Sequence, residues 1–487
     1  MPGPQPADCI PLTVRIVGRG LDPSARPEAG RPTIFGKHLP PCGVSGNRSY
    51  NPAQTIQYYI KGLPNENCHY LPRLPEEPGR RRRILPRLIK DGHTTVADPA
   101  EADIIIINTC GFIESAKTEA IENILMACQC KQENPDLKVI VTGCLAERYK
   151  QQIIQEIPEV DAVVGIGSNA ALPAIVRRIC ADGAGQIENY GPKSDMQLGG
   201  ARVISTPRHY AYLKIAEGCN NGCYYCAIPL IRGALRSREI NDCVAEARWL
   251  AGEGVRELIL VAQDPTAYGE DWGRPGAICE LLDRLQEIDG IRWIRILYAY
   301  PERISDAFIA AMVRNTKVVP YLDLPIQHCD DAVLKAMNRR GGRKEIEDAI
   351  ARLRAAIPGI TLRTTLIAGF PGETEEQYAE LCDFVKTVRF DRLGCFAYSA
   401  EENTVAARME NQLDEETKQR RADHIMELQA EVSAAREGEK VGHTYECICD
   451  GVDDETGMYL LRTKADCPNR RQRADPRGHP AGNRRIL

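Results

Sequence analysis

The stretch Glu217-Gly218-Cys219-Asn220-Asn221-Gly222-Cys223-Tyr224-Tyr225-Cys226 decides the fold of this chain. Its three cysteines are spaced C-x3-C-x2-C and directly follow a strand that the apolar pattern predicts at 210–215. Three thiolates on one loop can bind three irons of a four-iron cluster and leave the fourth iron open to a ligand. The Asn and Gly residues between them allow a tight turn. A zinc site would need a fourth Cys or His nearby, and the flanking sequence offers none; buried structural thiols are the remaining alternative.

An alternation of strands and helices continues downstream of this stretch. Apolar residues recur at helical spacing in segments such as 242–253 and 343–355. Strands are predicted at 210–215, 257–262, 293–297, 321–324, 361–368 and 392–398. Six such units in about 230 residues predict an open or partial (β/α) barrel, whose chemistry collects at the C-terminal ends of its strands. A long charged helix is predicted next, at 414–439, and β-type alternation at 445–461.

A separate α/β region precedes the barrel. Short β-branched runs predict strands at 102–108, 137–142 and 161–165, with helices at 118–130 and 146–157 between them. This order predicts a parallel sheet. The polar, Gly-rich residues 181–205 are predicted to form a linker.

The two ends differ in composition from the body. Residues 1–86 hold 15 of the 32 prolines, and 12 Lys and Arg against 6 Asp and Glu. Proline at this density disfavours helix interiors and central strands, so we expect this segment to be disordered. A basic arm that binds nucleic acid is the alternative. Residues 468–487 have the same character, with six Arg and one Asp.

Composition excludes several classes of protein. The 487 residues are 43% hydrophobic and 26% charged, which is typical of globular proteins of about three domains. The net charge of −5 does not favour nucleic acid or an acidic membrane. No apolar run is long enough to span a bilayer, and the N-terminus lacks a secretory signal pattern. We expect a cytoplasmic protein, in which 19 cysteines are more often metal or redox groups than disulfides.

The cysteine stretch resembles the cluster loop of radical S-adenosylmethionine (SAM) enzymes. The resemblance implies that Cys219, Cys223 and Cys226 ligate a 4Fe-4S cluster whose open iron is chelated by the amino and carboxyl groups of SAM. An electron from the cluster then cleaves SAM to methionine and a 5′-deoxyadenosyl radical. Tyr225 matches the aromatic residue before the last ligand, where its ring packs near the cluster and its backbone near the adenine. Core packing is the alternative for this tyrosine.

Two further segments resemble the N-terminal domain of methylthiotransferases. These are Asn108-Thr109-Cys110-Gly111-Phe112-Ile113-Glu114-Ser115-Ala116-Lys117 and Val141-Thr142-Gly143-Cys144-Leu145-Ala146-Glu147-Arg148-Tyr149. In the family, three cysteines of this domain hold a second, auxiliary 4Fe-4S cluster, and Cys110 and Cys144 match two of them. Each follows a predicted strand where a helix begins, and helix N-termini favour a thiolate. Buried core thiols are the alternative.

The resemblance covers about residues 87–465 and favours the branch that modifies an aspartate of small-subunit ribosomal protein twelve. The segments that favour this branch are 110–117, 228–233, 261–264, 298–301, 324–328 and 390–394. The alternative branch modifies adenosine in tRNA and usually has Ser-Gly-Ser after the Gln at 327, where this chain has His328-Cys329-Asp330.

The resemblance also implies contacts with SAM. Gln263 and Asp264 end the second barrel strand, where the family places contacts to the SAM amino group. The segment TTLIAGFPGE (364–373) leads from a strand into a turn, and Gly369, Gly372 and Glu373 are expected near the adenine and ribose. Glycines there remove side chains where a cofactor approaches, although an ordinary βα turn is the alternative. No residue is assigned to proton transfer.

Both ends depart from the family pattern. The third auxiliary ligand and the first strand of its domain are expected before Cys110, yet the family's Gly-Cys-Pro-Lys-Asn motif is absent around Cys9, Cys42 and Cys68. After 441–466, which resembles the start of an OB-like TRAM barrel, a basic tail replaces the remaining strands. The chain is therefore interpreted as a damaged copy of an active enzyme.

The sequence as a whole predicts an α/β enzyme with three folded parts. They are an incomplete flavodoxin-like domain with its linker (87–200), a radical SAM partial barrel (201–440) and a truncated TRAM module (441–467), flanked by aberrant segments 1–86 and 468–487. The predicted reaction is methylthiolation of the aspartate β-carbon, impaired by the aberrant N-terminus. The alternatives are tRNA adenosine methylthiolation and a non-catalytic remnant that binds ribosomal protein or RNA. Expected partners are the ribosomal protein, an electron donor such as flavodoxin or ferredoxin, and RNA at the TRAM module, with no membrane.

Overall fold

The computed structural model of this chain contains two compact units. The structure describes residues 12–15, 56–61, 84–96, 98–111, 114–181, 185–200, 202, 204, 206–453, 456–467 and 472–474. The larger unit is Ala53–Arg436, and the smaller combines Met1–Pro52 with Glu437–Leu487. Within the larger unit, the part around the sheet with strands between residues 56 and 189 is called the N-terminal lobe. The part around the sheet with strands between residues 210 and 397 is called the barrel.

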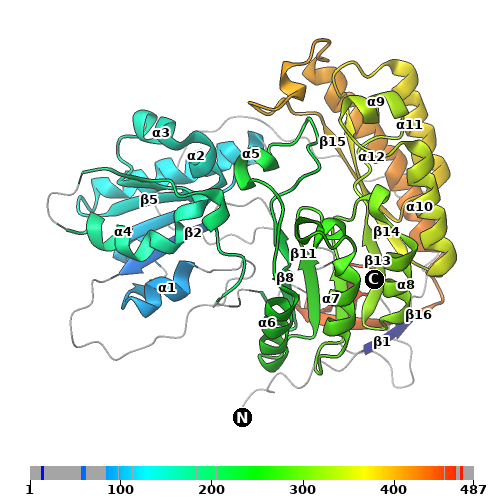
Figure 1. Ribbon diagram of the computed structural model, residues 1–487, viewed down its shortest axis with the longest axis horizontal. Coiled ribbons are helices and arrows are strands. Elements are labelled where there is room, and N and C mark those ends of the chain that lie inside the picture. Colours follow the sequence, from blue (N-terminus) through cyan, green and yellow to red (C-terminus); the bar gives the residue numbers. More distant parts are fainter. Residues whose placement is uncertain are drawn as a thin grey trace. The chain divides into compact units, whose positions relative to one another are not determined.

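The N-terminal lobe is a six-stranded sheet with helices on both faces (Figure 1). Its strands, in spatial order, are β3 (Thr94–Thr95), β2 (Ile56–Lys61), β4 (Ile104–Thr109), β5 (Lys138–Gly143), β6 (Ala162–Val164) and β7 (Ile187–Asn189). Its helices are α1 (Ile84–Lys90), α2 (Glu114–Gln129), α3 (Cys144–Glu156) and α4 (Leu172–Ile179). Ile105 and Ile107 pack with α2 and α3, whereas Ile104 and Ile106 pack with α1 and α4. Burial on both faces explains the unbroken apolar run in β4.

The edge of this sheet differs from the prediction. Counted along the chain, the strand order is 2-1-3-4-5-6, which begins with the flavodoxin-like order. The strand numbered 1 in this order is β2. It runs antiparallel to both of its neighbours, β3 and β4, whereas β4 to β7 are parallel to one another. The prediction that 1–86 is disordered is therefore wrong for β2, whose aromatic and β-branched residues suit a strand. Among the described residues, no strand parallel to β4 lies at this place beside it. The place is occupied by β2, which runs in the opposite direction. The predicted linker also contributes a strand, β7.

The barrel is built on a six-stranded parallel sheet, as predicted. Its strands, in spatial order, are β8 (Tyr210–Lys214), β11 (Glu257–Val261), β12 (Trp293–Ile296), β13 (Val318–Asp323), β14 (Thr361–Ala368) and β15 (Arg392–Ala397). Each strand pairs with its chain neighbour, so all their C-terminal ends lie at one rim. A short hairpin, β9 (Ala216–Glu217) with β10 (Arg236–Ser237), flanks the cysteine loop.

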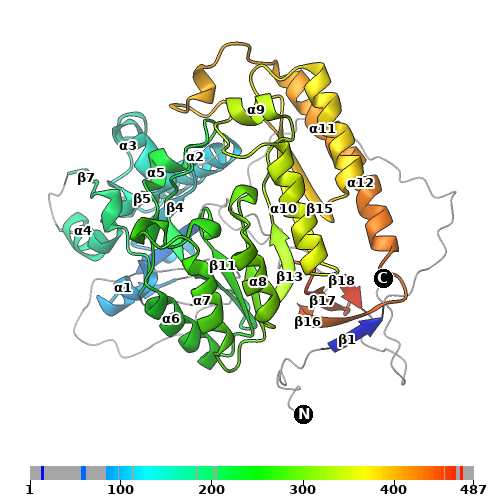
Figure 2. The same ribbon diagram turned by 45° about the vertical axis from the view of Figure 1, so that its right-hand side comes forward.

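Helices cover the outer face of this sheet (Figures 1 and 2). They are α6 (Ile240–Gly252), α7 (Ala277–Gln286), α8 (Asp306–Arg314), α10 (Arg343–Ala356) and α11 (Glu375–Val388), and α5 (Ile228–Arg232) and α9 (Asp331–Ala336) are short helices at the rim. The long helix α12 (Glu415–Gly438) runs beside α11, where Arg421 pairs with Glu375. The apolar faces of α6, α7, α8, α10, α11 and α12 share one core with the strands of the barrel. None of the helices in the described part of the chain combines the length and apolar character that crossing a bilayer requires.

The smaller unit is a four-stranded antiparallel sheet. Its order is β1 (Leu12–Arg15), β16 (Thr444–Val452), β17 (Tyr459–Thr463) and β18 (Gln472–Ala474). Cys447 and Leu461 form its small core, and a fully buried pair joins Arg462 to Asp450 at 3.1 Å. The predictions of irregular ends are wrong for β1 and β18, because a short segment gains strand structure by pairing with an existing edge. The other residues of 1–55 and of 475–487 lie outside the described residues.

Candidate active site

The cysteine loop leaves the barrel at the C-terminal end of β8, as the sequence predicts. Gly218 opens the loop with a φ of +75°, and a Cβ there would lie 2.0 Å from the carbonyl oxygen of Ala234. Only glycine suits such a left-handed, crowded position. Tyr224 N donates to Met337 O, which holds the far side of the loop.

Two of the three loop thiols accept hydrogen bonds from backbone amides. The backbone N–H groups of Asn221 and Ile228 donate to the sulfurs of Cys219 and Cys226, at 3.5 and 3.4 Å. Burial raises the pKa of Cys219, and it raises that of Cys226 to about 12, so these free thiols are protonated at neutral pH. Amide donors favour the thiolate, which is the form that binds metal. Among the described residues, however, no three His, Cys, Asp or Glu side chains converge closely enough to hold a metal ion.

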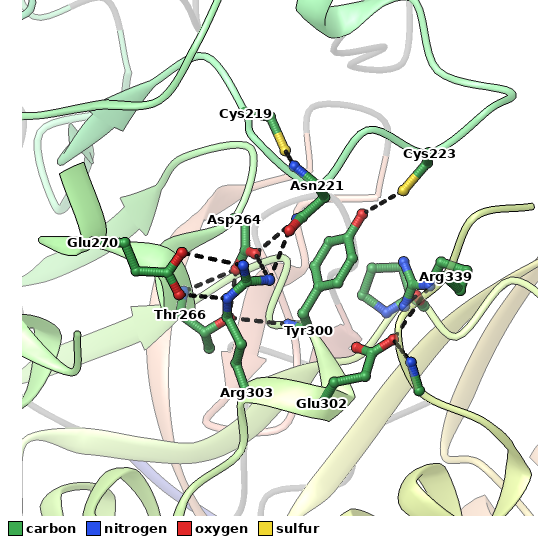
Figure 3. A network of polar contacts seen from close by, with 12 residues as sticks. Cys219, Asn221, Cys223, Asp264, Thr266, Glu270, Tyr300, Glu302, Arg303 and Arg339 are labelled. Carbon is green, nitrogen blue, oxygen red and sulfur yellow. Dashed lines mark hydrogen bonds and ion pairs between the residues drawn. The ribbon is translucent and has the colours of Figure 1, made fainter. Parts of the chain in front are cut away.

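The ends of β11 and β12 hold a polar network beneath the loop (Figure 3). Asp264 Oδ2 accepts hydrogen bonds from Asn221 Nδ2 at 2.8 Å and from Arg303 Nη1 at 3.0 Å. Arg303 also binds Glu270, with Nε at 2.7 Å from Oε1. Burial raises the pKa of Asp264 despite the opposing effect of Arg303. The predicted SAM contact of Asp264 remains a prediction, because its carboxylate already has these partners within the chain.

Gln263 lies beside the start of the cysteine loop. Its Nε2 donates to Glu217 Oε1 at 2.8 Å, and its Oε1 is buried without a hydrogen-bond partner among the residues that the structure describes. Glu217 is also bound by Lys214 and by Arg232, the latter at 3.2 Å. A buried amide oxygen is normally satisfied, so this acceptor fits a donor such as the SAM amino group.

The predicted adenine turn is only partly open. Gly369 faces helix α12, where an added Cβ would lie 2.6 Å from Lys418 Cγ, whereas a Cβ on Gly372 would meet nothing within 4 Å. The Glu373 carboxylate accepts from Gly369 N at 2.9 Å and from Arg421 Nη1 at 2.6 Å. These contacts within the chain give Glu373 a role in holding the turn.

The same turn reaches the cysteine loop through apolar contacts. Phe370 packs in one cluster with Tyr224 and Tyr225. Burial raises the pKa of Tyr225 well above its usual range. The structure therefore brings the 364–373 segment and the aromatic residue before Cys226 together. The packing role named as the alternative for Tyr225 is present in this structure.

Three residues of the rim were given no role by the sequence. Tyr300 O–H lies 3.1 Å from Cys223 Sγ, and the Arg339 guanidinium lies 4.0 Å from the centre of the Tyr300 ring. Together with Arg303 they line a cavity of about 320 Å³ beside the loop. Tyr300 and Arg303 follow β12, so the rule that barrel chemistry collects at strand ends could have found them. Arg339 follows α9 and carries no such signal.

Cys110 and Cys144 follow adjacent strands, β4 and β5, at the same end of the sheet of the N-terminal lobe. Parallel pairing of Thr109 with Gly143 places the two cysteines at adjacent strand ends, and Cys144 is the first residue of α3. Arg232 Nη2 donates to Cys144 Sγ at 3.0 Å, so the barrel reaches this edge six residues after Cys226. The other candidates for an auxiliary ligand, Cys9, Cys42 and Cys68, lie outside the described residues.

Two family models match the chain. The model of the radical SAM superfamily matches residues 213–385, and that of uncharacterized protein family UPF0004 matches residues 81–165. Among solved structures, the cobalamin-dependent S-adenosylmethionine radical enzyme OxsB is similar with a TM-score of 0.44 and 12% identity, over 77% of this chain and 57% of that chain.

Curated relatives match most of the chain. The ribosomal protein uS12 methylthiotransferase RimO of Acetivibrio thermocellus is 44% identical over 79% of this chain and 86% of its own length. The protein of the same name from Bdellovibrio bacteriovorus is 45% identical over 77% of this chain and 83% of its own length. The chain therefore belongs to the radical SAM superfamily and, within it, to the family of ribosomal protein uS12 methylthiotransferases.

Proposed function

We propose that this chain transfers a methylthio group to the β-carbon of an aspartate in ribosomal protein uS12. The observation that carries the proposal is the cysteine loop at the end of β8, where backbone amides donate to Cys219 and Cys226. The resemblance of the flanking segments to this branch of the family supports the choice of substrate. An unactivated carbon offers no acidic proton, so a general base alone cannot start the reaction.

The residues of the barrel would hold the cofactors and keep them apart from water. Cys219, Cys223 and Cys226 would bind a 4Fe-4S cluster, and Gln263 Oε1 would accept a hydrogen bond from the amino group of SAM. When bound, the cluster and SAM supply the radical chemistry that removes a hydrogen atom from the substrate carbon. The Asp264–Arg303–Glu270 chain of contacts fixes the strand ends beneath the loop.

The N-terminal lobe would hold the sulfur donor. Cys110 and Cys144 lie at adjacent strand ends and would supply two ligands of an auxiliary cluster. The third ligand of the family pattern has no counterpart among the described residues. With two thiolates only, the chain as written would cleave SAM at the barrel but transfer little methylthio group.

The remaining assignments follow from the same proposal. The electron donor would be a flavodoxin or ferredoxin, and a TRAM-like smaller unit would contact RNA. The site of action would be the cytoplasm, where ribosomes are assembled. The proposed domain limits are 87–200, 201–440 and 441–467, with β1, β2 and β18 added from the flanking segments.

An assay against both substrates of the wider family tests the proposal. Anaerobically reconstituted protein, SAM and a chemical reductant are incubated with uS12 or with tRNA, and the products are identified by mass spectrometry. We expect methylthiolated uS12, in low yield, and unmodified tRNA. Methylthioadenosine in tRNA with unmodified uS12 would contradict the choice of substrate. Protein without iron and without 5′-deoxyadenosine formation would favour the non-catalytic remnant.

A further inference from the structure

A group of charged side chains joins the N-terminal lobe to the barrel within the larger unit. It consists of Lys117 on α2, Arg148 and Tyr149 on α3, and Glu401 and Glu402 in the loop after β15, and is called the interlobe cluster. The lobe and barrel residues are about 250 positions apart in the chain and meet only through the fold.

Arg148 is the centre of the interlobe cluster. Its Nη1 donates to Glu401 Oε2 at 2.9 Å, and its Nη2 donates to Glu402 O at 2.9 Å. Nη1 also donates to Gly111 O at 3.0 Å. The Arg148 and Glu401 side chains are only 5% and 6% exposed. One guanidinium therefore links helix α3, the backbone next to Cys110 and a loop of the barrel.

The other members balance the charge. Lys117 Nζ lies 3.4 Å from Glu401 Oε2 and is 7% exposed, and Tyr149 O–H donates to Glu402 Oε2 at 2.8 Å. Both cations thus pair with the one carboxylate of Glu401, whereas the carboxylate of Glu402 accepts from the neutral Tyr149. Glu401 is fixed on the barrel side as well, because Thr404 Oγ1 donates to its carbonyl oxygen at 2.6 Å.

A buried charge pair of this kind contributes little to stability compared with apolar packing, but it is strongly unfavourable to break. It therefore selects one arrangement of the two surfaces that carry it. An exposed pair lacks this effect. The Arg177–Asp91 pair of the same lobe is such a pair, since the Arg177 side chain is 53% exposed.

We propose that Arg148 and Glu401 are positioning residues, which set the placement of the Cys110–Cys144 edge relative to the barrel. Gly111 directly follows Cys110, and Arg148 lies one turn after Cys144 on α3. The pair thereby holds the carrier of the sulfur at a fixed distance from the site of radical formation. This inference rests on the proposed function, because only a reaction with two separate donors requires that distance. A change in the distance between the Cys110–Cys144 edge and the barrel should lower the yield of methylthio transfer more than it lowers the cleavage of SAM.

Hydrogen–deuterium exchange of the full reconstituted chain tests the pair directly. The variants are R148Q, E401Q and the double variant R148Q/E401Q, with R177Q as the matched control. We expect at least tenfold faster exchange in peptides covering 104–120 and 399–408 for each single variant, and no further increase in the double variant. R177Q should leave both peptides unchanged. Exchange no faster in R148Q than in R177Q, or additive effects in the double variant, would overturn the proposal.

The product ratio separates positioning from general damage. We expect 5′-deoxyadenosine formation in R148Q to stay within twofold of the wild type, while methylthiolated uS12 per 5′-deoxyadenosine falls at least tenfold. R148K, which keeps the charge, should recover part of the ratio. An equal loss of both products, or an unchanged ratio, would overturn the positioning role. If the wild type makes no methylthiolated uS12, the proposed function fails, and the exchange comparison alone decides whether the pair fixes the lobes.

Discussion

Gln263 and Asp264, neighbours at the end of β11, have opposite hydrogen-bond environments. The amide nitrogen of Gln263 is bound to Glu217, which fixes the side chain, while no described residue donates to its buried oxygen. Asp264, the next residue, has the opposite environment, with donors from Asn221, Thr266 and Arg303. Of these two neighbours, Gln263 is the better candidate for direct contact with SAM, and Asp264 holds the rim.

The cysteine loop gives the first prediction at this scale. Changing Cys219, Cys223 or Cys226 to Ala should abolish formation of 5′-deoxyadenosine, because a cluster with two thiolates is lost or misligated. Chromatography of the nucleoside products and iron analysis check this. Cys243→Ala is the control, since Cys243 is buried in α6 and packs in the barrel core. Cleavage of SAM that persists in one of the three loop variants would show that another group is the ligand.

Glu373 gives a pH-dependent prediction. Burial acts to raise the pKa of Glu373, but His328, Gly369 N–H and Arg421 outweigh it and lower the pKa. Because the folded pKa is depressed, the stabilisation is present above the unfolded value of about 4.3 and is lost as pH falls through the folded pKa. Glu373→Gln should cost about 3 kcal/mol at pH 7, since it leaves Arg421 and His328 without their buried partner.

Thermal unfolding of the wild type and the Glu373→Gln variant at pH 7 and at pH 4 measures this effect. The difference between their midpoints should shrink at the lower pH. Glu427→Gln serves as the control, because Glu427 is exposed in the middle of helix α12. A difference that stays constant with pH would show that the charge of Glu373 does not stabilise the turn.

At the scale of elements, strands with long apolar runs were predictable, and strands in the two terminal segments were not. All six barrel strands and the strands β4, β5 and β6 follow from apolar runs, because burial on both faces leaves a strong signal. The strands β1, β2 and β18 lie in Pro- and Arg-rich segments, and short strands of this kind depend on a partner edge that local sequence does not specify. For the site, the three loop cysteines follow from their spacing. Arg339 and the interlobe cluster depend on contacts between distant segments, which spacing cannot indicate.

The direction of β2 bears on the auxiliary cluster. Ile56 pairs with Asn108 near Cys110, whereas Ile60 pairs with Ile104 at the other end of the strand. Cys68 comes after the end that points away from the cysteine edge. We therefore expect about four irons per chain, the content of one 4Fe-4S cluster, both in the chain as written and in Cys68→Ala. Iron and sulfide analysis after anaerobic reconstitution measures this. About eight irons that fall to about four in Cys68→Ala would contradict it.

At the scale of the whole molecule, the two ends of the chain contribute to one sheet. Leu12 pairs with Cys447 and Arg15 with Thr444, so the N-terminal segment is part of the smaller unit together with 437–487. The larger unit begins only at Ala53 and contains every residue assigned to the cofactor sites. Damage to the first fifty residues should therefore affect the two units unequally.

Deletion of residues 1–52 tests this division. Loss of β1 exposes the part of β16 that pairs with it, so amides of residues 444–447 should exchange at least tenfold faster, which corresponds to about 1.4 kcal/mol of local stability. Amides of β14 should keep their protection, and 5′-deoxyadenosine formation should persist. Hydrogen exchange followed by mass spectrometry measures both regions. Faster exchange throughout the barrel would show that the two units do not fold independently.

The pairing of β1 with β16 also sets the order of events during synthesis. The partner of β1 is translated about 430 residues later, which at 5–20 residues per second means a delay of roughly 20–90 s. Throughout that time Leu12–Arg15 has no β16 edge to pair with, while the strands of the larger unit are translated in order. The smaller sheet can therefore form only after residues 444–474 have been translated. A nascent chain that stalls in α12 would contain every strand of the barrel sequence but not the partner of its first strand.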